Sequence, residues 1–506
     1  MTKEKNLIYI ILVFSLFFHI ICVNFYPVNF EFIFFEASSF IKEGFKKEIA
    51  SQFFDMQANT FLFSFVISFF SIIFPFIEPV HIGKIISLSS FIFISLAALN
   101  LLEKKTFSNS NNFNHIGYFL VFLILNPLIW VFGYRATPDV ISVALAFYGF
   151  SIIYKYPKNN NYLYFAAIIL GFATSLKVLT GIYLIAGMML VKFSYIKKNF
   201  TNCLIIAILY AIIPLVYFSI TYYNFNFFLF TPYYQSVLTS VYNPALYLNN
   251  LILYLSFLFI FSTPILTGNI IINIKNFSVK SIIINAPIYL IAYYLGSTDL
   301  IPSDEMNFGF FSNYLNSNIL NGLLYCCSYS AVLLMYFKIR RSYFIKDFLS
   351  IRLLFVVIVY LLIIASSLAS QRYLIVILPL FYFIFRFYIY EGFKLNLLFL
   401  LVICVPANIL LVTNQYLSGS VSSKMVKYIN ENNLMENVCP NAIGVHAGHE
   451  FPIASRDRVT CALKDLKILK GNGDNDTAVV HSITERIFFL KKEVYLSSDV
   501  RPDIKY

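Results

Sequence analysis

The sequence predicts an all-α polytopic membrane protein followed by a small soluble domain. Of the 506 residues, 59% are hydrophobic and only 12% are charged, whereas soluble domains are about half apolar and about a quarter charged. Apolar runs close to the roughly 20 residues that cross a bilayer recur until about residue 413. Because a chain in lipid must satisfy its own backbone hydrogen bonds, we expect these runs to be spanning helices.

The apolar runs predict about thirteen spanning helices. The first is 7–23, which has the length of a signal peptide but no A-x-A-like cleavage site, so we interpret it as the first helix. The other predicted spans are roughly 84–102, 116–133, 140–154, 162–176, 178–193, 201–221, 251–272, 280–296, 319–337, 350–369, 373–390 and 395–413.

Residues 24–83 are predicted to form a long external loop with an interfacial or re-entrant helix at about 60–77. This Phe-rich run is apolar enough to cross the membrane. If it did, every later loop would change sides, and three basic pairs would lie outside, against the positive-inside rule. These pairs are Lys104/Lys105, Lys197/Lys198 and Arg340/Arg341.

With 60–77 treated as non-spanning, the charges of the membrane part divide between the cytoplasmic and the external side. Most basic residues lie at cytoplasmic helix ends, and the N-terminus is cytoplasmic. A few basic residues face outward together with most of the acidic ones, which suggests chemistry on the external face. The outward basic residues are Lys42, Lys46, Lys47, Lys84, Arg135, Lys177 and Arg372.

The C-terminal tail, 414–506, has a different composition. About a quarter of its residues are charged, as in soluble domains. We expect a small external α/β domain, long enough to bury a small core. Its two cysteines, Cys439 and Cys461, either form a disulfide or are free thiols, and their spacing does not decide between the two.

One short stretch between two predicted spans combines opposite charges. Gly133-Tyr134-Arg135-Ala136-Thr137-Pro138-Asp139 places an Arg and an Asp four residues apart, and the Pro disfavours a helix running through. Three other outward stretches carry polar residues. They are the acidic segment from Glu31 through Glu36 to Gly44, Ser175-Leu176-Lys177, and Gln371-Arg372-Tyr373-Leu374.

The order of these elements resembles the GT-C membrane glycosyltransferases, which use a polyprenyl-phosphate sugar donor. The shared pattern is an acid in the first external loop before a Gly-ended helix, a Pro-Asp, a Gly-x-x-x-x-x-Lys and a late Arg-Tyr…Pro. In this chain they are Glu31 to Gly44, Pro138-Asp139, Gly171 to Lys177, and Arg372-Tyr373…Pro379. The terminal external domain is similar to the aminoarabinose and protein mannosyl branches. The Phe/Tyr/Ile/Asn-rich composition is similar, more weakly, to phage-type O-antigen glucosyltransferases.

The resemblance implies an inverting transfer of a sugar, such as glucose, to a surface or lipid-linked glycan such as O antigen, on the external face of the inner (plasma) membrane. A carboxylate must take the proton of the acceptor hydroxyl, and cations must hold the departing phosphate. The predicted catalytic carboxylates are Glu31 and Asp139, with Glu36 and Asp55 as alternates to Glu31. The predicted phosphate-binding residues are Arg135, Lys177, Arg372 and Tyr373.

Several roles stay open at this point. Asp139 either orients the acceptor or a cation, or pairs with Arg135, and either Glu31 or Asp139 could be the base. The aminoarabinose branch carries a phosphate-binding Lys where this chain has Met56. One of the other outward lysines could substitute, or the donor differs. The candidates are Lys46, Lys47 and Lys84.

Simpler structural interpretations also exist. Arg135 and Asp139 could form an interfacial salt bridge, Glu31 could be a solvated loop acid, and the outward Lys and Arg could snorkel to the interface. No cofactor is required by the sequence, although a divalent metal is allowed, and we expect partners to be donor, glycan acceptor and bilayer, not nucleic acid. Two other functions fit a polytopic protein: a polysaccharide polymerase or ligase that uses lipid-diphosphate oligosaccharide, and a transporter or flippase, which favours ionisable residues near mid-helix.

The predicted topology can be tested by labelling. Cysteines introduced at Lys104 and at Ser418 are expected on opposite sides of the membrane, so a membrane-impermeant thiol reagent should reach only the Ser418 position in intact cells. Labelling of both positions from outside would mean that 60–77 spans the membrane.

Overall fold

The computed structural model describes most of the membrane part and a portion of the tail. The described residues are 2–25, 31, 34, 38, 62–102, 112–191, 199–225, 244–273, 279–297, 317–366, 371–391, 393–431, 479–487 and 490–497. They form helices and one two-stranded sheet, joined by turns. Two compact units divide the chain: a larger unit of 1–16, 89–133 and 139–406, and a smaller unit of 17–88, 134–138 and 407–506.

Five helical segments of the described chain are long and apolar enough to cross a membrane. All five coincide with predicted spans, so the prediction of a helical membrane protein is confirmed at this level. The five segments are Pro79–Leu102, Phe200–Tyr223, Pro244–Gly268, Asn318–Phe344 and Phe393–Leu417. The full count of about thirteen spans stays a prediction.

The larger unit is a bundle of closely packed helices. Its first half contains α6 (Ser90–Leu102), α7 (Asn112–Ile124), α8 (Pro127–Phe132), α9 (Pro138–Lys155), α10 (Asn160–Leu176), η1 (Val178–Gly181), α11 (Ile182–Met188) and α13 (Phe200–Phe225). The first residue of α9, Pro138, belongs to the smaller unit. Its second half contains α15 (Pro244–Asn273), α16 (Val279–Ser297), α17 (Ser317–Phe344), α18 (Phe348–Ile364), η5 (Gln371–Val376), α19 (Leu378–Ile384), α20 (Arg386–Glu391), α21 (Phe393–Phe399) and the π-helical turn η6 (Leu400–Cys404).

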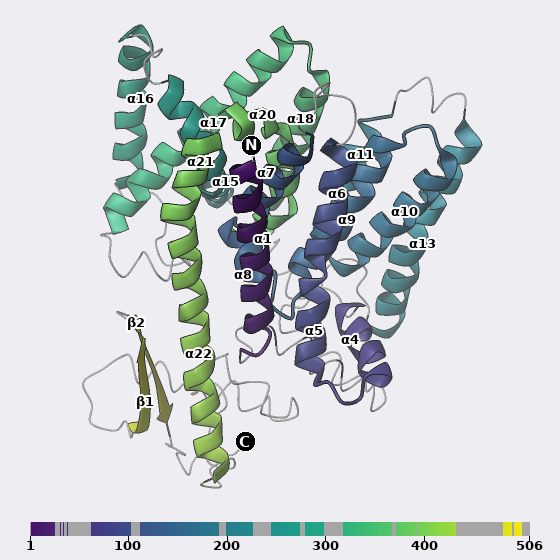
Figure 1. Ribbon diagram of the computed structural model, residues 1–506, viewed down its shortest axis with the longest axis vertical. Helices are drawn as coiled ribbons and strands as arrows, with labels where there is room; N and C mark the ends of the chain where they lie inside the picture. The colour runs from purple at the N-terminus through teal and green to yellow at the C-terminus, as the bar shows by residue number, and fades with distance from the viewer. Residues whose placement is uncertain are drawn as a thin grey trace. The chain divides into compact units, whose positions relative to one another are not determined.

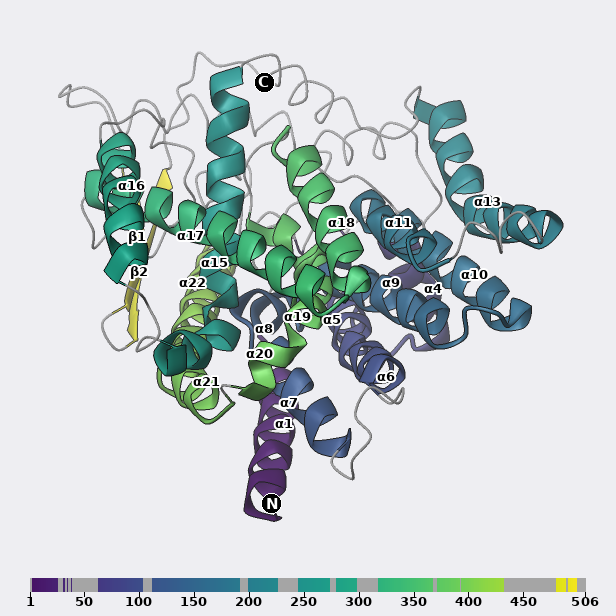
Figure 2. The ribbon, with the colours of Figure 1, turned by 90° about the horizontal axis from the view of Figure 1, so that it is seen from above.

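Small residues allow close helix packing in this unit. In both views α10 and α13 lie side by side (Figures 1 and 2). A Cβ at Gly171 of α10 would collide with the backbone carbonyl oxygen of Tyr210 in α13. Close backbone approach at glycine is a usual way to pack helices in a membrane. The Gly of the Gly171-to-Lys177 pattern is therefore explained by packing.

Two predicted spans are broken in the structure. Residues 116–133 form α7 and α8 with a break at Asn126, because a residue before Pro disfavours the helical conformation. Residues 373–390 are divided among η5, α19 and α20. The Asn126 side chain donates to Tyr382 Oη at 3.0 Å and to the Phe261 carbonyl at 2.9 Å. These two hydrogen bonds give partners to the Asn126 side-chain amide and to the Phe261 carbonyl in an apolar interior. A helix break inside a membrane protein is tolerated when the polar groups near it have such partners.

The smaller unit contains the end of α1 (Thr2–Cys22), α4 (Leu62–Ile73), α5 (Pro79–Leu88), most of α22 (Val405–Glu431), and an antiparallel hairpin of β1 (Val479–Ile487) and β2 (Leu490–Ser497). The hairpin pairs Ile487 with Leu490 next to its turn. Helices α4 and α5 lie side by side (Figure 1). With 12 residues, the described part of α4 is about 18 Å long, and the interfacial position of 60–77 stays a prediction.

The boundary predicted at residues 413 and 414 falls inside a helix. Helix α22 continues from the apolar segment to Glu431 without a break. The change in composition at this point marks where the sequence becomes polar, and a helix can cross such a change because its backbone hydrogen bonds are internal.

Candidate functional site

The stretch that carries Arg135 and Asp139 connects two helices. The chain leaves α8 at Phe132 and enters α9 at Pro138, whose fixed φ suits a first helical position. Between them the Thr137 amide donates to the Arg135 carbonyl at 2.7 Å, which makes a tight turn. Residues 134–138 belong to the smaller unit, and Asp139 begins a segment of the larger unit. The two charges therefore take part in separate clusters.

The first cluster centres on Glu31. Its side chain is 1% exposed, and one carboxylate oxygen lies 3.7 Å from Arg135 Nε. The other oxygen accepts a hydrogen bond of 2.8 Å from the Ala136 backbone amide. One carboxylate thus holds both the side chain of Arg135 and the backbone after it. Burial of an ionised carboxylate requires this kind of pairing.

A second cation, Lys84, completes this Glu31 cluster of Glu31, Lys84 and Arg135. Lys84 is 1% exposed, donates to the Phe25 carbonyl, and lies within Coulombic range of both Glu31 and Arg135. Two cations and one carboxylate give the cluster a formal charge of +1. The sequence offers Lys84 as one of three possible substitutes for the missing phosphate-binding lysine, and its place beside Arg135 follows from the packing of α5.

Helix α5 is pressed against the turn that carries Arg135. A Cβ at Gly83 would lie only 2.9 Å from Ala136 Cβ, so the glycine permits the contact. The Ser87 hydroxyl donates to the Thr137 carbonyl at 3.0 Å. The turn is therefore held by α5 as well as by Glu31.

The second cluster centres on Asp139 at the start of α9. Its carboxylate pairs with Lys177 Nζ, and the two side chains are 9% and 12% exposed. Lys177 follows the last residue of α10. An acid at a helix N-terminus and a cation at a helix C-terminus each complement the helix dipole. The pair thus also ties the start of α9 to the end of α10.

Tyr373 links this pair to Arg372. Lys177 Nζ lies 5.7 Å and Arg372 Cζ 5.6 Å from the centre of the Tyr373 ring, distances typical of cation–π contacts. The Tyr373 carbonyl accepts a hydrogen bond of 2.6 Å from the buried Tyr360 hydroxyl. We call Asp139, Lys177, Arg372 and Tyr373 the Asp139 cluster, and its two cations and one carboxylate also sum to +1.

The structure thus gathers the predicted site residues into two groups. Lys177, Arg372 and Tyr373 lie together with Asp139, although they come from three distant parts of the sequence. Arg135 pairs with Glu31, and Asp139 pairs with Lys177. Both charges of the stretch 133–139 therefore have a partner that is distant in the sequence. The alternates Glu36 and Asp55, and the cysteines Cys439 and Cys461, lie outside the described residues.

Among the described residues, no three or more His, Cys, Asp and Glu side chains are grouped so that they could hold a metal ion.

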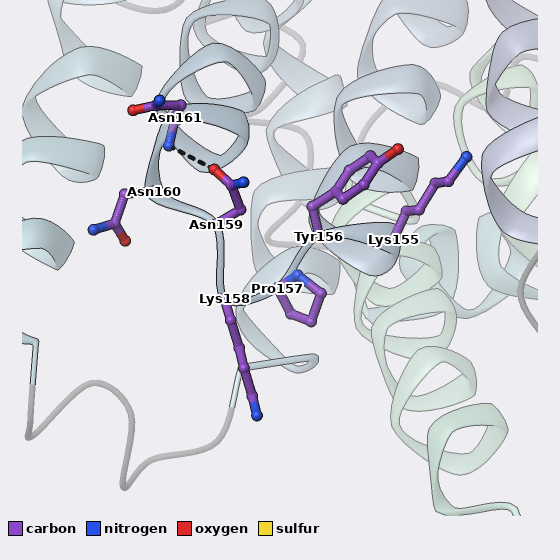
Figure 3. Close-up of a pocket in the computed structure, with 7 residues that line it drawn as sticks. All are labelled: Lys155, Tyr156, Pro157, Lys158, Asn159, Asn160 and Asn161. Atoms are coloured by element: carbon purple, nitrogen blue, oxygen red, sulfur yellow. Dashed lines mark hydrogen bonds between the residues drawn. The ribbon is translucent and has the colours of Figure 1, made fainter.

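An open hollow of about 710 Å³ lies at the other end of α9 (Figure 3). It is lined by the turn from Lys155 to Asn161, where Asn159 caps α10 by accepting from the Asn161 amide at 3.2 Å. Sixteen residues of helix separate Asp139 from Lys155, about 24 Å. The hollow is therefore remote from the Asp139 cluster and does not belong to it.

Comparisons with protein-family models, with curated proteins and with solved structures found no match.

The pairing in the Asp139 cluster predicts coupled effects on stability. Asp139→Asn and Lys177→Met should each lower the thermal unfolding temperature of the detergent-solubilised protein, because each leaves a mostly buried charge unpaired. In the double variant, the loss in the free energy of unfolding should be smaller than the sum of the losses in the two single variants, by about 1 to 3 kcal/mol. The exposed Lys158→Met is the control and should unfold like the wild type. Additive losses would mean that the two charges do not interact.

Proposed function

We propose that the protein is an inverting glycosyltransferase that works on the external face of the membrane. It moves a sugar, a hexose such as glucose, from a polyprenyl-phosphate carrier to a surface or lipid-linked glycan such as O antigen. The membrane environment is supported by the five apolar helices. The chemistry is supported by the two charged clusters and by the resemblance in sequence.

The observation that carries the proposal is the convergence of the Asp139 cluster. Residues 139, 177, 372 and 373 lie in three separate segments of the sequence, and a purely interfacial role would not require them to meet. Their contacts place two cations on one aromatic ring beside a carboxylate. This is a suitable surface for a phosphate that is attached to a lipid, since Arg offers a fork of donors and Lys a compact charge.

The proposed donor is a lipid monophosphate, as the sequence resemblance implies. A sugar joined to a lipid through one phosphate is a phosphodiester with one negative charge, and Lys177 and Arg372 are suited to bind it. When the bond from the sugar to the phosphate breaks, the phosphate gains a second negative charge. Lys177 and Arg372 would stabilise this leaving group, and groups that bind developing charge contribute strongly to catalysis.

Glu31 is the proposed general base. We assign this role to Glu31 from the sequence resemblance alone: the base takes the proton of the acceptor hydroxyl as the hydroxyl oxygen attacks the anomeric carbon, and the electron pair of the breaking bond goes to the phosphate oxygen. One displacement inverts the anomeric centre. The contacts to Arg135 and to the Ala136 amide fix the orientation of the carboxylate. Asp139 has the separate role of holding Lys177.

The proposal predicts loss of transfer in two variants. In proteoliposomes with a polyprenyl-monophosphate hexose and a glycan acceptor, Glu31→Gln should reduce the transfer rate about 10² to 10⁴-fold, the usual contribution of a general base. Asp139→Asn should also abolish transfer, because Lys177 loses its partner. Glu78→Gln is the matched control, since Glu78 is an exposed acid in the smaller unit, with a side chain that is 75% exposed. Wild-type rates in both site variants, at equal amounts of folded protein, would show that the site is assigned wrongly.

The same assay separates the other functions. A product formed only from lipid-diphosphate oligosaccharide would identify a polymerase or ligase. Movement of lipid-linked sugar across the bilayer without a covalent product would identify a transporter or flippase. Either result would overturn the proposed transfer reaction.

A further inference from the structure

The C-terminal helix contacts the turn that carries Arg135. The hydroxyl of Tyr134 donates a hydrogen bond to Gln415 Oε1 on α22. Tyr134 is 2% exposed. Its burial raises the pKa of the hydroxyl well above the ordinary range, so the group keeps its proton and acts as the donor. The contact joins residues 281 positions apart within the smaller unit.

Aromatic packing strengthens this contact. The ring of Phe25 lies edge-on to Tyr134, with 6.4 Å between centroids, and 5.0 Å from the ring of Tyr416. The His19 ring lies 6.0 Å from Tyr134, also edge-on. Edge-on arrangements of this kind are a favourable geometry for aromatic pairs. Helix α22 therefore contacts Tyr134 directly through the hydrogen bond of Gln415, and Tyr416 contacts it indirectly through the ring of Phe25.

Arg135 directly follows Tyr134, so the two side chains share one backbone segment. The same short turn is held by Glu31 through the Ala136 amide and by Ser87 through the Thr137 carbonyl. The Phe25 that packs on Tyr134 also provides the carbonyl that accepts from Lys84. Both cations of the Glu31 cluster thus depend on groups that pack around Tyr134.

We propose that Gln415 is a positioning residue that fixes Arg135 in the Glu31 cluster by holding Tyr134. This inference rests on the proposed function for its effect on catalysis, but not for the contact itself. The inference assigns a role to the part of α22 that follows the last predicted span. Its first polar turn holds the turn at 134–138, which contacts the proposed base Glu31. Gln415 acts through Tyr134 and touches no reacting atom.

Activity variants test the role. Gln415→Leu and Tyr134→Phe should each lower kcat/KM for the lipid-monophosphate donor about tenfold, the effect of losing one buried hydrogen bond. The double variant should lose no more than either single one. Gln415→Glu keeps the acceptor oxygen and should retain most activity. Asn414→Leu is the matched control, because Asn414 is the adjacent amide on α22 and is exposed.

A further measurement distinguishes positioning of Arg135 from a general structural role of Gln415: the effect of Gln415→Leu in a protein that lacks the Arg135 side chain. In an Arg135→Ala background, Gln415→Leu should have no further effect on kcat/KM. A full additional tenfold loss there, or wild-type activity of Gln415→Leu, would overturn the inference. If Gln415→Leu does not fold, the smaller change Tyr134→Phe decides by the same criteria.

Crosslinking separates this inference from the proposed function. Tyr134→Cys and Gln415→Cys are combined in a Cys22→Ala background, and membranes are treated with a short bis-maleimide. The paired variant should crosslink, and Tyr134→Cys with Asn414→Cys should crosslink less. A crosslink in a protein whose wild type transfers no sugar would leave the contact standing and refute the transferase. No crosslink, with an active wild type, would refute the role of Gln415.

Discussion

Charge pairing in an apolar environment is the constraint on which the candidate site depends. A buried charge without a partner costs several kcal/mol, and removing one partner of a buried pair typically costs about 3 to 5 kcal/mol. In this chain, Glu31 with Arg135 and Asp139 with Lys177 meet that constraint. Each pair has a further cation beside it, Lys84 in one cluster and Arg372 in the other. The cations of each cluster are groups that can bind an anionic ligand.

The pairs also have structural consequences. Asp139 and Lys177 are placed where helix dipoles favour their charges, so the salt bridge supports the packing of α9 against the end of α10. Glu31 binds both the side chain and the backbone of the following turn. Only three residues separate Arg135 from Asp139 along the chain. A change that loosens the turn at 134–138 is therefore expected to affect the Glu31 cluster, to which Arg135 belongs.

The sequence predicts the five long apolar helices because their apolar length is sufficient to cross a bilayer. It also singles out Asp139, Lys177 and Arg372, since charged residues at the ends of apolar helices are few, whereas their roles stay a prediction from the resemblance. The partners are harder to predict. The spacing of Arg135 and Asp139 suggests that they pair with each other, but the turn at Thr137 and Pro138 sends them to partners at positions 31 and 177.

Other features depend on tertiary contacts that no local pattern reveals. Lys84 is recognisable as a charge in an apolar helix, but its position beside Arg135 depends on the contact between Gly83 and Ala136. The break at Asn126 is signalled by the Pro that follows, whereas the hydrogen bonds that make it tolerable come from distant helices. Gln415 looks like an ordinary polar residue at the end of a span, and only the fold brings it to Tyr134.

The structure of the surface glycan tests the central claim most directly. Cells with and without this gene are compared by mass spectrometry and linkage analysis of their lipid-linked and surface glycans. Transfer from a lipid monophosphate predicts one additional monosaccharide at a defined position in cells that carry the gene. Identical glycans, or a change in polymer length without a new residue, would contradict the account.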